Sequence, residues 1–303
     1  MAQITAHNTE IDGRPLRLTN LEKVLYPATG FTKADLIDYY IRVAPAMLPH
    51  LRGRPITFKR YPNGVEQPFF FEKNCASHRP SWVRTAKVTY NDGSTIEHCL
   101  IEDRATLAWA ANLGAIELHT SLAYADRIGQ PTMIVFDLDP GEGVGLRECG
   151  RVALVLRDLL EGLKLRTVVK ASGGKGLHVY LPLNTQVGYE QTRPFAHAMA
   201  KMVQQAMGDA VITKMSRAER AGRVFIDWSQ NTLHKTTVCV YAMRAVREPA
   251  VSRPLDWAEV QELASQRREG WLDCSPEAAL RAVREHGDRF EGALQWRQRL
   301  TNA

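Results

Sequence analysis

The sequence predicts a mixed fold of strands and helices, either α/β or α+β, in one domain with two lobes that divide near residues 125–132. Some segments carry apolar residues at helical spacing, and others are short apolar runs between turns, which are typical of strands. The two kinds of segment alternate along the chain, which favours a mixed core over an all-α or all-β one. We find no internal repeat, low-complexity tract or linker in the 303 residues.

The first half of the chain contains two predicted helices with a strand between them. GFTKADLIDYYIRVAPAML follows a turn at Gly30, and Thr32 with Asp35 forms a capping box that indicates a helix start. GRPITFKRYPNG (53–64) is typical of a short strand between turns. RATLAWAANLGAIELH (104–119) has apolar residues at helical spacing, so we expect a helix there.

The second half begins with a buried strand, PTMIVFDLD, followed by an amphipathic helix, LRECGRVALVLRDLLEGLKL. The apolar stripe of that helix is Val152, Leu156, Leu159, Leu160 and Leu163. RTVVKASGGKGLHVYLPL (166–183) predicts a strand, a glycine loop and a second strand.

Four further elements complete the chain. We expect a helix over 193–207, a strand with a polar exit over 222–231 and another strand over 236–245. A helical tail follows a proline-rich entry at 249–254.

Composition sets the broad class of protein. Lys plus Arg number 39 against 33 Asp plus Glu, and the formal net charge of +6 makes an anionic partner plausible. No apolar run approaches the roughly 18 residues of a membrane span, and the N-terminus lacks the apolar core of a signal peptide. We therefore expect no membrane partner.

The five cysteines are scattered, with no CxxC pair, so we expect no disulfide framework and a reducing, cytoplasmic setting. Cys75, His78, His98 and Cys99 could surround a zinc ion, but their spacing fits no zinc pattern. Unpaired cysteines and surface histidines are the favoured interpretation.

The stretch VFDLDPGEG ends an apolar strand with two aspartates, Asp137 and Asp139. Side chains at i and i+2 of a strand share a face, here roughly 6–7 Å apart. For such a pair alone, a solvated strand end is the favoured interpretation, and a site for Mg²⁺ or Mn²⁺ is the alternative. Asp227, which also ends an apolar strand, favours the metal site, because three converging carboxylates suit two-metal phosphoryl transfer.

A glycine loop, Ser172 to Gly176, lies between the two strands of 166–183. Its backbone N–H groups could face a phosphate, and His178 with Tyr180 falls on the polar face of the second strand. A glycine hairpin with a core histidine is the alternative. The loop is not a Walker P-loop, because a strand follows it and no Ser or Thr follows Gly-Lys.

Five segments in fixed order, LTNLEKVLYP, GRPITFKRYPNG, VFDLDPGEG, SGGKGLHVYLPL and RVFIDWSQNTLHKTT, resemble the polymerase domain of bacterial ligase D. That domain belongs to the archaeo-eukaryotic primase superfamily and serves non-homologous end joining. The resemblance covers residues from about 17 to about 258. It implies a two-lobed α+β primase-polymerase fold with an RRM-like catalytic sheet flanked by helices.

The resemblance also implies a division of the chain and an activity. A DNA-end-binding lobe would cover about 1–128, a catalytic lobe about 129–250 and a helical tail about 251–303. Family members are nucleotidyltransferases that extend or fill DNA ends, favour ribonucleotides and work best with manganese.

By residue-to-residue match, the resemblance assigns Asp137, Asp139 and Asp227 as the catalytic ligands of two Mn²⁺ or Mg²⁺ ions. The implied nucleotide-binding residues are Ser172, Lys175, His178, Arg220, Lys235, Arg244, Phe70 and Phe71. The implied ligands of a downstream 5′-phosphate are Lys23, Lys33 and Asn20, and those of the template are Lys59 and Arg60.

The implied partners are DNA with 5′-phosphorylated gaps or ends, nucleoside triphosphates, a DNA ligase and an end-binding protein, in the nucleoid of a bacterium. The chain departs from the family at His234 and in Cys239-Val240-Tyr241-Ala242, which bears on sugar preference and activity level.

Two other classes of function remain open from the sequence. A metal-dependent nuclease would use the same acids but leaves the glycine loop and the phosphate lysines unexplained. A non-catalytic DNA-end binding module would keep the lysines but has no need of the three acids.

Overall fold

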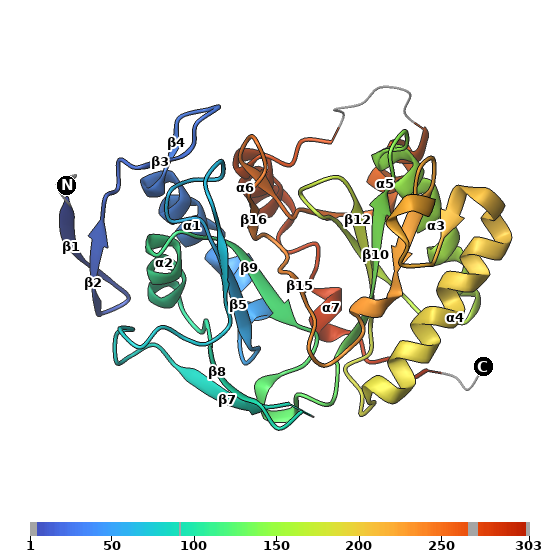
Figure 1. The fold of residues 1–303 in the computed structure, drawn as a ribbon, viewed down its shortest axis with the longest axis horizontal. Coiled ribbons are helices and arrows are strands. Elements are labelled where there is room, and N and C mark those ends of the chain that lie inside the picture. Colours follow the sequence, from blue (N-terminus) through green and yellow to red (C-terminus); the bar gives the residue numbers. More distant parts are fainter. Residues whose placement is uncertain (1–4, 91, 266–271, 301–303) are drawn as a thin grey trace. The chain divides into compact units, whose positions relative to one another are not determined.

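The structure is a computed structural model, and it describes residues 5–90, 92–265 and 272–300 (Figure 1). The chain divides into two compact units. The first unit comprises Met1–Ser121, Val238–Val251 and Ser275–Gly287. The second comprises Leu122–Thr237, Ser252–Cys274 and Asp288–Ala303. Both mix strands and helices, which confirms the predicted α+β class. The assignment of the whole chain to one domain, with lobes and a tail at the expected boundaries, stays a prediction.

The second unit contains the sheet that carries the three candidate catalytic acids. Its strands are β10 (Met133–Pro140), β11 (Val168–Ala171), β12 (Leu177–Pro182), β13 (Val211–Ile212), β14 (Val224–Asp227) and β18 (Pro254–Leu255). Its helices are α3 (Leu146–Gly162), α4 (Tyr189–Met207), α5 (Trp257–Ser265) and α7 (Gly292–Gln295), with short 3₁₀ helices η1 (Ala125–Arg127), η2 (Gly208–Ala210), η3 (Arg217–Glu219) and η4 (Trp228–Gln230). The strand order is β13-β14-β10-β12-β11-β18, and neighbours are antiparallel except β13 and β14.

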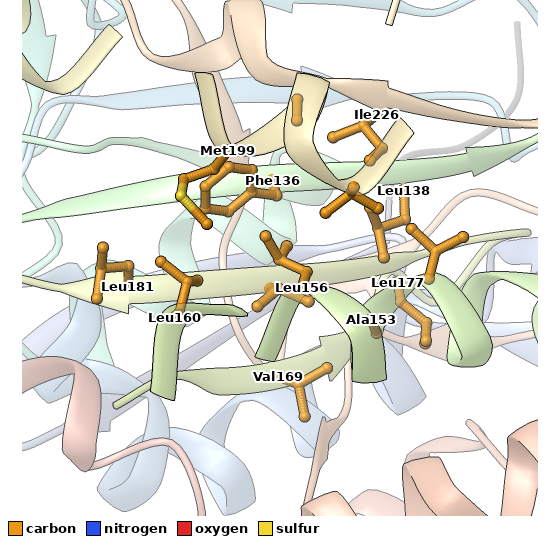
Figure 2. Packing of buried hydrophobic residues seen from close by; sticks show 14 of the residues in the cluster. Phe136, Leu138, Ala153, Leu156, Leu160, Val169, Leu177, Leu181, Met199 and Ile226 are labelled. Atoms are coloured by element: carbon orange, nitrogen blue, oxygen red, sulfur yellow. The ribbon is translucent and has the colours of Figure 1, made fainter. Parts of the chain in front are cut away.

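One face of this sheet is apolar, and α3 and α4 cover it (Figure 2). Phe136 and Leu138 of β10 point to that side together with Leu177 of β12, and they pack with Leu156 of α3 and Met199 of α4. Burying each such side chain stabilises the fold by about 1.5–3 kcal/mol. Because side chains alternate along a strand, the residues between them must lie on the opposite face.

The first unit is built around a second sheet. The strands of this unit are β1 (Ala6–Ile11), β2 (Arg14–Thr19), β3 (Val24–Tyr26), β4 (Phe31–Thr32), β5 (Ile56–Arg60), β6 (Phe70–Glu72), β7 (Thr85–Thr89), β8 (Thr95–Cys99), β9 (Ala115–Ser121), β16 (Met243–Arg244) and β17 (Ala250–Val251). Of these, β1-β2, β3-β4 and β16-β17 form separate two-stranded sheets. Its helices are α1 (Lys33–Leu51), α2 (Arg104–Asn112) and α6 (Pro276–His286), and β15 (Thr236–Val238) ends within it. The main strand order is β15-β9-β5-β8-β7, with β6 also paired to β5.

The predicted start of α1 is confirmed. The Thr32 hydroxyl accepts a hydrogen bond from the Asp35 N–H (3.3 Å), and the Asp35 carboxylate accepts one from the Thr32 N–H (2.7 Å). These two bonds satisfy backbone donors that a helix leaves unpaired at its first turn. Lys33 is therefore the first residue of the helix, as expected.

The helix predicted over 104–119 is wrong in its second half. α2 ends at Asn112, and Gly114 adopts φ +75°, the left-handed conformation that commonly ends helices. A Cβ atom on Gly114 would also lie 3.1 Å from the Tyr61 carbonyl oxygen. Residues Ala115–Ser121 then form β9. Helical and strand spacing are hard to separate in a short apolar run, and the glycine was the available signal.

Smaller differences concern where elements end. The strand predicted over 236–245 is interrupted, because Tyr241 takes φ +64° between β15 and β16. Leu163 was expected in the apolar stripe of α3, but the helix ends at Gly162 and Leu163 is exposed. The segment predicted as a helical tail contains α5, α6 and α7 but also the strand β18, and its residues 266–271 and 301–303 lie outside the described residues.

The expectation of unpaired cysteines is wrong for one pair. Cys75 and Cys99 form a disulfide, with their Cα atoms 4.9 Å apart. β8 brings Cys99 to the segment around Cys75, whose N–H donates to the Glu97 carbonyl (2.6 Å). Sequence spacing could not show this contact, which depends on strand pairing. The disulfide also removes both thiolates from the zinc arrangement considered above.

No helix in the described parts of the chain is long and apolar enough to cross a membrane.

Candidate active site

The polar face of the second unit's sheet gathers the three predicted acids. Asp137 on β10 is the register partner of Asp227 on β14, and Asp139 lies two residues further along β10. Side chains directly opposite in an antiparallel pair share a face, with Cβ atoms about 4.5–5.5 Å apart. Asp227 is buried, Asp137 is half-buried and Asp139 is exposed. The adjacency of the two strands, inferred from sequence, is confirmed.

Local structure after β14 fixes the Asp227 carboxylate. Its Oδ1 accepts hydrogen bonds from the Ser229 N–H (2.9 Å) and hydroxyl (2.6 Å), and its Oδ2 accepts one from the Gln230 amide (3.0 Å). This is the turn that an aspartate favours at the start of a short helix. The Lys235 ammonium donates to the Ser229 hydroxyl (2.6 Å), so this predicted residue also lies beside the acids.

Asn231 is a further part of this arrangement that the sequence gave no reason to select. Its side chain is fully buried, and its amide donates to the Val135 carbonyl (2.8 Å) while its Oδ1 accepts from the Val135 N–H (2.9 Å). The ladder between β14 and β10 stops at the pair of Asp227 and Asp137. The Asn231 side chain thus makes the two hydrogen bonds with the Val135 backbone that a residue of a neighbouring strand would otherwise make.

His178 on β12 is the other register partner of Asp137. Its Nε2 lies 3.2 Å from Oδ1 of Asp137, and its Nδ1 lies 3.4 Å from the Tyr180 hydroxyl. The Tyr180 hydroxyl in turn donates to the Thr237 hydroxyl (3.0 Å). The predicted polar face of β12 is therefore confirmed, and it places the histidine beside the acids.

The glycine loop holds itself together through Ser172. The Ser172 hydroxyl accepts hydrogen bonds from the N–H groups of Gly174 and Gly176 (3.2 Å each). Glycine is required at 176, because a Cβ atom there would lie 2.1 Å from the Leu138 carbonyl oxygen. Lys175 is exposed in this loop. The N–H groups of Gly174 and Gly176, which were predicted to face a phosphate, are thus directed to the Ser172 hydroxyl.

Arg220 lies beside the end of β10. Its guanidinium stacks on the Phe225 ring at 3.7 Å and donates to the Met215 carbonyl (3.0 Å), and Phe225 is the register partner of Asp139. A Cβ atom on Gly141 would lie 1.8 Å from the Arg220 carbonyl oxygen, so the two segments are in close contact. The site in this unit therefore combines three acids with Arg220, Lys235 and His178.

The donor chemistry of the acids fits a hard divalent cation, which prefers carboxylate oxygens. In the described parts of the chain, however, no three His, Cys, Asp or Glu side chains are already close enough to hold a metal ion. As placed, the carboxylates of Asp227 and Asp137 are directed to Ser229, Gln230 and His178.

The first unit brings together the three residues predicted to bind a 5′-phosphate. The Lys33 N–H donates to the Lys23 carbonyl (2.8 Å), and the Lys23 N–H donates to the Asn20 carbonyl (3.1 Å). The Lys33 ammonium is buried and donates to the Thr19 carbonyl (2.8 Å), while that of Lys23 donates to the Asn63 side chain (2.7 Å). Burial, and then the nearby charge of Lys23, lower the pKa of Lys33 to about 8.

The residues predicted to contact template and base are divided between two faces of the first unit's sheet. Lys59 pairs with Phe71 across β5 and β6, and Arg60 pairs with Phe70. Because neighbours along a strand point to opposite sides, each face receives one cation and one ring. Arg60 forms a two-point salt bridge with Glu72 (3.1 Å to each oxygen). Lys59 lies 4.3 Å from the centre of the exposed Phe69 ring.

Glu117 and His119 on β9 share the face of Lys59, and sequence reasoning missed both. The reason is the incorrect helix over 104–119, in which these residues would not have lain beside β5. Arg244, a predicted nucleotide ligand, contacts Glu117 through its Nε (3.4 Å). The signal that could have revealed them was Gly114, which separates the helix from the strand.

Comparison with known proteins identifies the family of this chain. The family described as "LigD, primase-polymerase domain" matches residues 32–290. A multifunctional non-homologous end joining protein LigD from Mycolicibacterium smegmatis is 43% identical over 250 residues, 82% of this chain and 32% of that protein. A bifunctional LigD from Bacillus subtilis is 33% identical over 261 residues, 86% of this chain and 42% of that protein. The solved polymerase domain from Mycobacterium tuberculosis ligase D in complex with DNA has a TM-score of 0.84 and 40% identity, covering 91% of this chain and 96% of that one.

The fold and these comparisons place the chain in the primase-polymerase class of nucleotidyltransferases, a metal-dependent group of enzymes. These two curated relatives are longer proteins, of which the chain spans 32% and 42%. The chain belongs to the LigD primase-polymerase domain family.

Proposed function

We propose that this chain is a DNA-dependent polymerase that extends DNA ends and fills short gaps with ribo- or deoxynucleoside triphosphates during repair of DNA breaks. The observation that carries the proposal is the pairing of Asp137 with Asp227 across β10 and β14, with Asp139 on the same face and His178 alongside. Three carboxylates among basic groups suit transfer of a nucleotidyl group better than simple DNA binding, which needs no cluster of acids.

Asp137, Asp139 and Asp227 would hold two divalent cations, Mn²⁺ or Mg²⁺. When bound, such ions neutralise phosphate charge and lower the pKa of an attacking hydroxyl. The chain's own contribution is positional. The Asp227 carboxylate is fixed by Ser229 and Gln230, which reduces the freedom it must lose when it binds a ligand.

Basic and polar residues near the acids would bind the incoming triphosphate. His178, Lys175, Arg220 and Lys235 would contact phosphate oxygens, and Ser172 would act mainly by shaping the glycine loop. Within the first unit, Arg244 and Phe71 would offer further contacts to a nucleotide or base, and Phe70, on the opposite face of the sheet, would not share them.

DNA would be held by two sets of residues in the first unit. Lys23, Lys33 and Asn20 would bind a downstream 5′-phosphate, because their backbone bonds already bring them together. Lys59 would lie against the template. The salt bridge to Glu72 supports a mainly structural part for Arg60, with any template contact secondary.

A polymerase of this kind would act with a DNA ligase and an end-binding protein, and its place would be the bacterial cytoplasm at the nucleoid. The supporting observations are the names of the relatives, which are non-homologous end joining proteins, and a structural neighbour whose title describes a complex with DNA.

One assay tests the proposal against its alternatives. The protein is incubated with gapped, 5′-phosphorylated DNA, labelled nucleoside triphosphate and Mn²⁺, with Asp137→Ala as the matched control. We expect primers to lengthen with the wild type and to stay unchanged with the variant. Shortened strands would indicate a nuclease, and binding without any chemistry would indicate an end-binding module; either result would overturn the proposal.

A further inference from the structure

Glu117 is a buried carboxylate surrounded by basic groups. Its side chain is 2% exposed. Oε2 lies 2.8 Å from Nε2 of His119, and Oε1 lies 3.4 Å from Nε of Arg244 and 3.6 Å from the Lys59 ammonium. Oε1 also accepts a hydrogen bond from the Ala245 N–H (3.1 Å). A single carboxylate therefore joins side chains from β5, β9 and β16, which are distant in the sequence.

The basic groups of this cluster keep the Glu117 carboxylate ionised. Burial alone would raise its pKa, but the hydrogen bond from His119 and the charges of Arg244 and Lys59 outweigh burial and lower the pKa to about 2. Burial, partly offset by the bond to Glu117, lowers the pKa of His119. A buried carboxylate is costly unless it is paired in this way, so the cluster holds together as a unit.

The cluster carries more positive than negative charge, and the positive groups are the ones that reach solvent. Glu117 supplies one negative charge against the two cations Lys59 and Arg244. The side chains of these two cations are 18% and 22% exposed, whereas that of Glu117 is 2% exposed. The carboxylate thus lies beneath a cationic surface, which is suited to an anion.

The cluster lies next to aromatic rings of the same sheet. Lys59 is the register partner of Glu117 on β9 and of Phe71 on β6, so the three residues form a row across three strands. The exposed rings of Phe69 and Phe71 have their centres 4.3 and 5.8 Å from the Lys59 ammonium. Cations interleaved with exposed rings are the combination that binds the phosphates and bases of single strands.

We propose that Glu117 is a positioning residue, which holds Lys59, His119 and Arg244 in one arrangement so that their outward-facing donors bind a phosphate group of the substrate. Glu117 itself does not touch the substrate. The proposal rests on the proposed polymerase function, and it leaves open two sources of the phosphate, the template strand and the nucleoside triphosphate, which the experiment separates.

The decisive variant is Glu117→Gln, because positioning and simple electrostatics predict opposite results. The change raises the formal net charge of +6 by one unit, so a diffuse cationic surface would bind anions more tightly. If Glu117 positions the three basic side chains, binding weakens instead, by about tenfold, the worth of one charge-assisted hydrogen bond. Glu97→Gln is the matched control, since it makes the same charge change in the same unit, and its partners are Arg79 and Thr85.

Two binding measurements identify the source of the phosphate. Fluorescence anisotropy with single-stranded DNA reports the template, and calorimetry with a non-hydrolysable nucleoside triphosphate reports the nucleotide. We expect one of the two affinities to fall in Glu117→Gln and both to stay within about twofold of wild type in Glu97→Gln. In primer extension, the KM for the affected substrate should rise while kcat changes much less.

Unchanged or tighter binding of both probes by a folded Glu117→Gln protein would overturn the inference. If that variant does not fold, Glu117→Asp replaces it, since it keeps the charge but is one methylene too short to reach all three partners. A folded Glu117→Asp protein should bind more weakly than wild type, and wild-type affinity would overturn the inference equally. A wild-type protein that extends no primer would instead refute the proposed function, and the binding measurements would still decide the role of Glu117.

Discussion

Lys33 gives a prediction in which the structure sets both the direction and the size of a pH effect. Its ammonium is buried at the start of α1, and burial with the neighbouring Lys23 lowers its pKa to about 8. A DNA 5′-phosphate already carries most of its second charge at pH 7, because that ionisation has a pKa of about 6. Only protonated Lys33 can form a charge-assisted bond with it, so the preference for 5′-phosphorylated DNA should fall as the pH rises through about 8.

The magnitude follows from the fraction of protonated Lys33. If the bound phosphate keeps Lys33 charged, the dissociation constant scales with one plus the ratio of neutral to charged lysine in the free protein. With a pKa of about 8, that factor is about 1.1 at pH 7 and about 11 at pH 9. The affinity for 5′-phosphorylated DNA should therefore weaken about tenfold over this interval, or about 1.4 kcal/mol.

The assay is fluorescence anisotropy on gapped DNA with a 5′-phosphate or a 5′-hydroxyl, at pH 7, 8 and 9 and one fixed salt concentration. Lys33→Arg should abolish most of the pH dependence, because a guanidinium stays charged throughout. Lys33→Met should lose the preference at every pH. A wild-type preference that is constant from pH 7 to pH 9, or one that falls equally in Lys33→Arg, would refute the reasoning.

Three further predictions concern other parts of the structure. Asp137→Ala should abolish primer extension with little change in melting temperature, since it removes one of two facing carboxylates; normal extension would contradict the metal-site assignment. Asn231→Ala should lower the free energy of unfolding by about 1–3 kcal/mol, because it leaves the buried polar groups of Val135 without a partner, and denaturant unfolding measures it. Cys99→Ala should cost about 2–4 kcal/mol through loss of the bond to Cys75, and an unchanged unfolding midpoint would argue against the disulfide.

The positions of several candidate residues on their helices and strands were predicted correctly where local pattern and geometry coincide. The capping box at Thr32 placed Lys33 at a helix start, and the alternation after the glycine loop placed His178 on a polar face. Period-two alternation requires Asp137 and Asp139 to share a face. None of these inferences needed to know which strand lies beside which.

The prediction from the sequence was wrong where helical spacing and strand spacing fit the same residues. In 104–119 the apolar residues suit both a helix and a strand, and the helix was preferred although Gly114 interrupts it. That error concealed Glu117 and His119, because a helical assignment gives them no relation to β5. Gly114 takes φ +75°, a conformation that residues with a Cβ atom rarely adopt, so a glycine inside an apolar pattern weighs more than the continuity of that pattern.

Side-chain chemistry and alternation are local properties, so the mixed fold, the three acids as candidates and the segments that carry the basic residues could be inferred from the sequence alone. Strand pairing was needed to show that Asp227 lies opposite Asp137, that Cys75 meets Cys99 and that Glu117 joins Lys59 to Arg244. Each of these contacts joins residues distant in the chain. Strand register sets them, and register is fixed by the packing of the whole sheet against its helices rather than by any one segment.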